Sequence, residues 1–224
     1  RGRRAPRDRR RRRDRAGELR VATLAGDAAE HVVELVLAIG HPRPIAELSI
    51  HPLPEKPAHA ELVALLAPAR AGDPLGFVSD AGCPAVADPG AALVAAAHGS
   101  GIPVVPLVGP SAVLLALMAS GLSGQAFAFH GYLPVPEAAR AARVRELEAE
   151  SKARSCTQLF IETPYRNAAM LTTLANVLAP RTRLAVAADL TLPTESVSMR
   201  TAADWRRVDA TAYQKRPAIF MLQA

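Results

Sequence analysis

The stretch Phe77–Gly90, FVSDAGCPAVADPG, decides the fold, and a second stretch of the same design follows at Val104–Ala112, VVPLVGPSA. Each begins with a short β-branched or aromatic run, passes through a turn rich in glycine and proline, and leads into an alanine-rich helix. Such strand–turn–helix units build open α/β sheets, which bind ligands at the carboxyl ends of their strands. The two turns carry few reactive side chains. We therefore interpret them as turns that hold a cofactor through the backbone.

The same order of strand, turn and helix recurs later in the chain. Gln158–Glu162 predicts a strand, and Thr163-Pro164 opens a helix that continues to about Leu178. A capping residue followed by proline is a favourable helix start, because the missing proline N–H would have had no helical partner there. Alternating strands and helices predict an α/β fold. Further strands are expected at Ala46–Ile50, Leu75–Ser79, Val104–Val108, Phe127–Phe129, Leu184–Ala188, Ser196–Ser198 and Ala218–Leu222, and further helices at Asp27–Ile39, Ala58–Ala71 and Glu137–Lys152.

Charge is distributed very unevenly along the 224 residues. Residues 1–20 hold eleven arginines and three acidic residues, a net charge of +8, whereas the whole chain carries +6 and the remainder therefore −2. Such a segment cannot bury apolar surface. We expect residues 1–26 to be a disordered Arg-rich tail, whether an RNA-binding arm or a solvated extension, or a non-native N-terminus. We expect one α/β lobe over residues 27–107 and a second over residues 108–224.

Cysteine usage and hydropathy bear on compartment and on metal binding. The two cysteines, Cys83 and Cys156, show no CxxC spacing, which argues against a disulfide framework and a zinc site and fits a reducing compartment. The apolar run Ala112–Ala119 is shorter than the ~20 residues that a bilayer span needs. No apolar segment of the signal-peptide type follows the arginines. We expect a cytoplasmic protein without a bound metal or a membrane partner.

Five motifs connect the chain with a known family. They resemble, in order and spacing, motifs of the tetrapyrrole-methylase superfamily, and within it they are most similar to the ribosomal RNA small-subunit methyltransferase I branch. The resemblance covers roughly residues 75–224. It implies a homodimeric enzyme with two α/β lobes, which binds S-adenosylmethionine in the cleft between them and methylates RNA, in the manner of ribosomal RNA ribose 2'-O-methylation. The motifs are SDAGCPAVADPG (Ser79–Gly90), GPSA (Gly109–Ala112), FHGYLP (Phe129–Pro134), IETPYR (Ile161–Arg166) and DLTLPTESV (Asp189–Val197).

The resemblance also implies a set of cofactor-binding residues but names no catalytic base, so the catalytic residues stay unknown. Cys83 stands where the branch has threonine. This difference removes a hydroxyl group but should leave the course of the backbone unchanged. Glu162 has a structural alternative, since an acid at a strand end can serve the fold alone. The implied residues come from the first lobe, the start of the second lobe's first helix and two strand ends: Ala81, Gly82 and Cys83; Pro110, Ser111 and Ala112; Glu162, Leu190 and Thr191.

The residues independently favour a ligand without phosphate. The chain contains no GxxxxGK[ST] string, the pattern of a phosphate-binding P-loop. Backbone groups in glycine-rich turns, together with apolar walls, suit a nucleoside such as that of S-adenosylmethionine.

The N-terminal region departs from the family pattern and keeps alternatives open. The family begins with a strand followed by a P-x-G-N-L-type turn, and no such turn occurs in the first thirty residues. We therefore expect a central strand to be missing, which would leave ladder groups exposed. One alternative is a methyltransferase for a small molecule such as a tetrapyrrole. Another is a truncated, catalytically inactive member. RNA or a ribosomal subunit is the expected partner, although the mildly acidic body weighs against it.

Overall fold

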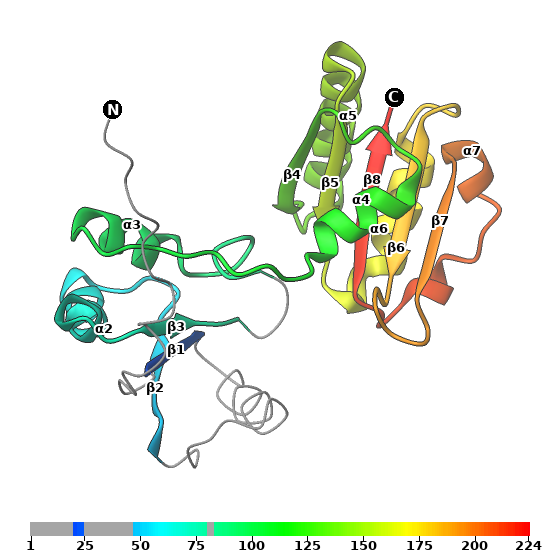
Figure 1. The fold of residues 1–224 in the computed structure, drawn as a ribbon. Helices are drawn as coiled ribbons and strands as arrows, with labels where there is room; N and C mark the ends of the chain where they lie inside the picture. Colours follow the sequence, from blue (N-terminus) through cyan, green and yellow to red (C-terminus); the bar gives the residue numbers. More distant parts are fainter. Residues whose placement is uncertain (1–19, 25–46, 80–82) are drawn as a thin grey trace, which may run out of the picture. The chain divides into compact units, whose positions relative to one another are not determined.

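The computed structural model describes residues 20–24, 47–79 and 83–224, with backbone only for the first of these ranges (Figure 1). The chain divides into two compact units, Arg1–Gly109 and Pro110–Ala224. The Arg-rich segment 1–19, the expected helix Asp27–Ile39 and the site residues Ala81 and Gly82 lie outside the described residues.

The first unit contains a three-stranded parallel sheet of order β2-β1-β3. Its strands are β1 (Arg20–Leu24), β2 (Ser49–Leu53) and β3 (Leu75–Phe77), and β1 pairs in parallel with both neighbours. The expectation that a central strand is missing was therefore wrong. Val21–Leu24 form a short run with two β-branched residues, but they lie close to the arginine-rich segment, so the sequence reading assigned them to the charged tail.

Two helices pack with this sheet in one small core. α2 (His59–Ala71) and α3 (Ala91–Gly99) contribute leucine and alanine side chains to a cluster that includes Leu53 of β2. α2 ends at Gly72, whose φ of 99° is a left-handed conformation that glycine adopts without a Cβ penalty. The predicted helix at Ala58–Ala71 is confirmed. The buried cluster comprises Leu53, Leu62, Leu66, Leu93 and Ala97.

The predicted strand Val104–Val108 is absent. The segment has no regular secondary structure, and its apolar side chains are exposed, Leu107 to 88%. Pro103 and Pro106 lack the N–H group that a strand ladder needs, and Pro106 interrupts the run in its middle. The β-branched composition alone was therefore misleading.

The second unit is a five-stranded mixed sheet of order β4-β5-β8-β6-β7. β4 and β5 are parallel, and every other neighbouring pair is antiparallel. β5 and β6 are both antiparallel to β8, which lies between them, so they run in the same direction. The strands are β4 (Phe127–Tyr132), β5 (Thr157–Ile161), β6 (Arg183–Ala188), β7 (Ser196–Thr201) and β8 (Ala218–Gln223).

Helices cover both faces of this sheet (Figure 1). α4 (Ala112–Ser120) lies on one face, and α5 (Glu137–Arg154) and α6 (Asn167–Val177) lie on the other. Shorter elements complete the unit: η3 (Pro164–Arg166), α7 (Ala202–Trp205) and η4 (Ala210–Tyr213). Every helix in the described part of the chain is too short or too polar to traverse a bilayer.

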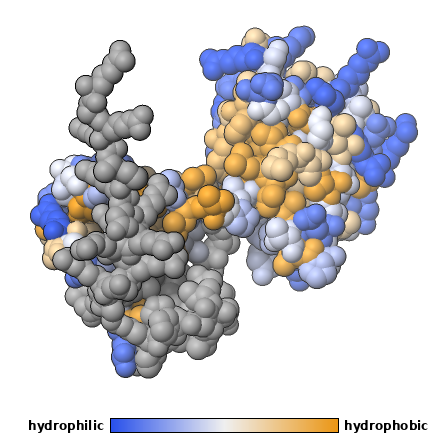
Figure 2. Space-filling view, viewed as in Figure 1, coloured by the Kyte–Doolittle hydropathy of each residue, from blue (hydrophilic) through white to orange (hydrophobic). Residues whose placement is uncertain are grey.

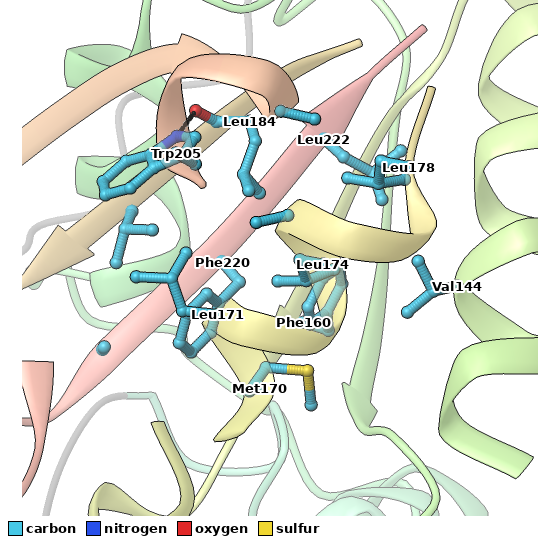
Figure 3. Packing of buried hydrophobic residues seen from close by; sticks show 14 of the residues in the cluster. Val144, Phe160, Met170, Leu171, Leu174, Leu178, Leu184, Trp205, Phe220 and Leu222 are labelled. Carbon is cyan, nitrogen blue, oxygen red and sulfur yellow. Dashed lines mark hydrogen bonds between the residues drawn. The ribbon is translucent and has the colours of Figure 1, made fainter. Parts of the chain in front are cut away.

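The core of the second unit follows the two-residue period of its strands. Phe160 of β5 and Phe220 of β8 stack on the α5–α6 side, with ring centroids 6.0 Å apart. Their chain neighbours Leu159 and Met221 pack on the opposite side, under α4. Trp205 closes the first cluster and donates a 2.7 Å hydrogen bond from Nε1 to the carbonyl of Leu184 (Figure 3). Apolar residues on both faces explain the nearly continuous hydrophobic strands.

The carboxyl ends of β5 and β6 lie at the same edge of this sheet. Ile161 at the end of β5 and Ala187 near the end of β6 both pair with Ile219 of β8. The C-terminal end of α4 lies at the opposite edge, because the N–H of Ser123, just beyond the helix, donates a hydrogen bond to the side-chain oxygen of Gln223 at the end of β8. The start of α4 is therefore directed toward the carboxyl ends of β5 and β6, which we call the carboxyl edge.

Candidate functional site

In the first unit, the turn after β3 is tightly built. Cys83 is half-buried, and its carbonyl accepts a 3.0 Å hydrogen bond from the N–H of Val86. Ala85 and Ala87 have φ angles of 66° and 61°, a region that non-glycine residues seldom occupy. Gly90 has a φ of 133°, and a Cβ there would lie 2.3 Å from the ring of Phe77. The turn thus packs closely on the end of β3 and holds a strained backbone.

In the second unit, the start of α4 presents unused polar groups. Ser111 is the N-cap residue, yet its side chain makes no capping hydrogen bond. The first N–H groups of a helix have no partner within it, and they carry a partial positive charge. Pro110 and Ala112, on either side of Ser111, are exposed. The hydroxyl of Ser111 and the first amides of the helix are therefore suited to a polar ligand group.

Glu162, just beyond β5, holds its carboxylate in an unusual way. Its side chain is 0% exposed. Oε1 accepts three hydrogen bonds, at 2.7 Å from the N–H of Thr163 and at 2.9 and 2.6 Å from Nε and Nη2 of Arg166. Oε2 is buried and has no partner among the described residues. Leaving a buried acceptor unpaired costs about 1–3 kcal/mol, so a ligand donor is the natural partner of Oε2.

The carboxylate of Glu162 affects the pKa of Arg166. Its hydrogen bond to Glu162 raises the pKa of Arg166 above the ordinary value, against a smaller opposing effect of desolvation. The guanidinium therefore stays charged and keeps Glu162 oriented.

The loop after β6 supplies the other predicted residues of this unit. Leu190 packs against the apolar cluster under α4, as do Val113 of α4 and Ile161 of β5. Thr191 is exposed and has a φ of 72°, which is an outlier for a β-branched residue. Its N–H donates a 2.7 Å hydrogen bond to the carboxylate of Glu195. The loop is thus held in a strained conformation beside the start of α4.

An ion pair that the sequence reading missed anchors this loop. Oδ2 of Asp189 accepts hydrogen bonds from Nε of Arg216 at 2.7 Å and from the hydroxyl of Thr194 at 2.9 Å. Nη2 of Arg216 also donates to the carbonyl of Thr194 and to the hydroxyl of Ser196. Burial raises the pKa of Asp189, but the hydrogen bonds from Arg216 and Thr194 outweigh it, so this pKa lies below its ordinary value. The position of Asp189 at a strand end was the available signal.

The structure brings the predicted residues of the second unit to the carboxyl edge. Glu162 and Leu190–Thr191 follow two strands that run in the same direction with one strand between them, a separation of about 10 Å. The start of α4, with Ser111, is directed toward the same edge. Cys83 belongs to the other unit. Apolar packing next to unused polar groups suits a ligand of nucleoside type.

Comparison with known proteins identifies the family. No protein-family model matches the chain. A ribosomal RNA small subunit methyltransferase I of Xylella fastidiosa is 34% identical over 202 residues, which cover 90% of this chain and 71% of that protein. The chain belongs to the ribosomal RNA small subunit methyltransferase I family. Family members from Mesorhizobium japonicum and Pseudomonas aeruginosa are 41% and 31% identical over 62% and 85% of this chain, and the chain spans 47% and 65% of their lengths.

Solved structures show that this family member has the tetrapyrrole-methylase fold. The methyltransferase CobJ superposes with a TM-score of 0.52 at 18% identity, covering 92% of this chain and 94% of that chain. The cobalt precorrin-4 methyltransferase CbiF gives a TM-score of 0.53 at 17% identity, covering 92% and 84%. The predicted α/β fold class is confirmed.

Proposed function

We propose that this chain is an S-adenosylmethionine-dependent methyltransferase that acts on RNA of the small ribosomal subunit. The observation that carries the proposal is the 34% identity over 202 residues with a relative of that name. The alternative of a tetrapyrrole acceptor has weaker support, because the tetrapyrrole methylases are similar at only 17–18% identity. The acceptor chemistry of the 2'-O-methylation type stays part of the proposal.

The residues at the carboxyl edge fit S-adenosylmethionine. Oε2 of Glu162 is a buried acceptor without a partner among the described residues, and it suits an ammonium or a ribose hydroxyl. The Ser111 hydroxyl and the first amides of α4 supply donors. Leu190 contributes apolar surface. When bound, the cofactor would supply a methyl group on a sulfonium, and these residues would hold it for transfer to the acceptor atom.

Calorimetric titration with S-adenosylhomocysteine tests this proposal. We expect binding with a dissociation constant in roughly the micromolar range, about −8 kcal/mol. Transfer of a labelled methyl group into small ribosomal subunits, compared with transfer into a tetrapyrrole extract, then identifies the acceptor. Absence of binding at millimolar ligand would contradict the enzyme and favour an inactive family member. Label in the tetrapyrrole extract alone would contradict RNA as the acceptor.

We also propose that the chain acts as a homodimer in the cytoplasm. An apolar patch supports the dimer: Leu114 and Met118 of α4 are exposed, Met118 to 81%, and Met199 of β7 is exposed as well. Figure 2 shows apolar residues gathered over this face of the second unit. Exposed apolar patches of this kind mark interaction surfaces. Sedimentation of the wild type and of Met118→Lys tests the dimer: the wild type should sediment as a dimer, and a monomeric wild type would contradict it.

A further inference from the structure

Exposed aromatic side chains concentrate at the carboxyl edge of the second unit. Three aromatic residues are exposed among those that the structure describes: Phe127, Tyr132 and Tyr165. Tyr165 lies in η3, directly after Glu162, and is 73% exposed. Tyr132 ends β4, pairs with Ile161 of β5 in the ladder, and is 59% exposed. Two of the three exposed rings therefore flank the strand end that carries Glu162.

Two cationic residues belong to the same part of the surface. Arg166 directs Nε and Nη2 to Glu162, whereas its Nη1 makes no hydrogen bond within the described residues. Tyr132 lies within electrostatic range of Arg166. Lys215 is exposed, and its N–H donates a 2.9 Å hydrogen bond to the carbonyl of Pro164, the first residue of η3. The backbone of Lys215 therefore lies next to η3, the element that carries Tyr165.

The backbone keeps this surface in place. Nε2 of Gln214 donates a 2.5 Å hydrogen bond to the carbonyl of Tyr165. Lys215 has a φ of 63°, a left-handed conformation with a cost of order 1–3 kcal/mol that the surroundings must impose. Strain of this kind concentrates at binding sites. The segment Gln214–Lys215 thus fixes the backbone of η3 through two hydrogen bonds.

Two of the three cations at this surface are paired. Arg166 is paired with Glu162, and Arg216 is paired with Asp189. Both pairs are neutral overall, whereas Lys215 contributes a positive charge and Glu195, in the loop after β6, a negative one. The affinity of a ligand for this surface should therefore depend more on contacts with the exposed rings than on net charge.

We propose that Tyr132, Tyr165, Arg166 and Lys215 bind a single-stranded segment of the RNA substrate. This inference rests on the proposed function and names the residues that hold the acceptor strand. Bases splayed out of a single strand stack on exposed aromatic rings, and neighbouring cations contact the phosphates. Tyr165 offers the more exposed ring, and Lys215 and Nη1 of Arg166 offer donors for phosphate oxygens. A nucleotide held here lies directly beside Glu162 at the candidate cofactor edge.

Fluorescence anisotropy with a labelled single-stranded oligonucleotide of small-subunit ribosomal RNA sequence tests the proposal on the full chain. Tyr165→Leu keeps an apolar side chain but removes the ring, and should weaken binding about tenfold, or about 1.4 kcal/mol. Tyr165→Phe keeps the ring and should retain the affinity. Lys215→Asn removes the charge, and asparagine tolerates the left-handed backbone. It should lower the slope of log affinity against log salt by about 0.7.

Matched control variants lie at the opposite edge of the same sheet. Phe127→Leu removes the exposed ring at the start of β4, and Lys152→Asn removes an exposed charge near the end of α5. Neither should change RNA affinity by more than about twofold, a difference of about 0.4 kcal/mol. If Tyr165→Leu and Lys215→Asn behave like these controls, this RNA surface is overturned.

Titration with S-adenosylhomocysteine separates this failure from failure of the proposed function. All five variants should bind it like the wild type, since none of the substituted residues is among the predicted cofactor-binding residues. Normal cofactor binding with unchanged RNA affinity in Tyr165→Leu overturns the RNA surface and leaves the methyltransferase in place. A wild-type chain that binds the cofactor but no RNA contradicts RNA as the acceptor and, with it, this inference.

Discussion

Replacing Glu162 by glutamine separates a ligand-binding role of this residue from a structural one. The amide oxygen of Glu162→Gln can still accept the 2.7 Å hydrogen bond from the N–H of Thr163. Its NH₂ group, however, takes the place of Oε2, which is buried and has no partner among the described residues. A donor then lies where an acceptor was. Arg166 is partly exposed, so solvent screens the lost ion pair. We expect the free energy of unfolding to fall by at most about 1 kcal/mol, through the weakened ion pair, because the group at this position is unpaired in both proteins.

The effect on ligand binding should be larger. A hydrogen bond to a charged acceptor contributes about 1.5–3 kcal/mol, so loss of the one at Oε2 should raise the dissociation constant of S-adenosylhomocysteine about 10- to 100-fold. Calorimetric titration measures this constant, and urea unfolding measures the stability. A variant that loses stability but binds within twofold of the wild type would refute the reasoning, because Glu162 would then serve the fold alone.

Glu148→Gln provides the matched control for this experiment. Glu148 of α5 also accepts a backbone N–H, that of Ala179 at 2.8 Å, and a side-chain donor, the hydroxyl of Thr182. It lies away from the carboxyl edge, since Thr182 precedes the start of β6. We expect a comparable loss of stability and an unchanged affinity for S-adenosylhomocysteine.

Three further predictions concern the fold. The pKa of Asp189 lies below its ordinary value near 3.8, so its charge stabilises the fold above about pH 4, and this stabilisation is lost as the pH falls through the lowered pKa. Asp189→Asn should therefore flatten this part of the acid-unfolding curve. An unchanged curve would contradict the ion pair. Phe160→Ala should cost about 3–5 kcal/mol in urea unfolding, because Phe160 is fully buried and stacked on Phe220; a cost below 1 kcal/mol would contradict that packing. Gly90→Ala should cost about 1–3 kcal/mol through its positive φ and the contact with Phe77, and Phe77→Leu should relieve part of that loss in the double variant.

Local patterns in the sequence predicted most of the elements. The alanine-rich helix expected after Val104–Ala112 is α4, and the left-handed Gly121 caps it. The apolar run Leu184–Ala188 is a strand because its side chains fill the cores on both faces of the sheet. The failures have local causes as well. Prolines in Val104–Val108 remove ladder donors, and the arginines before Val21 concealed the central strand of the first unit.

The candidate site was predictable only in part, because some of it depends on topology. Glu162 and Leu190 stood out as residues that follow apolar strands. Their common edge requires that β8 insert between β5 and β6, and no local pattern reveals this order. The same insertion brings Arg216, which precedes β8, against Asp189, 27 residues earlier. Contacts of this kind arise from strand order, so the anchor of the loop could not be read from spacing.

Strained backbone conformations occur in the glycine- and proline-rich turn of the first unit and in the loops of the candidate site of the second unit. Six non-glycine residues in the described part of the chain have a positive φ, and Ser155 among them caps α5. The other five lie in the turn after β3, in the loop after β6 and at the segment that holds η3: Ala85, Ala87, Asp189, Thr191 and Lys215. Each such conformation opposes folding by about 1–3 kcal/mol, and the cores must offset it. Replacing Thr191 by glycine should therefore raise the free energy of unfolding unless its hydrogen-bonded loop depends on the side chain.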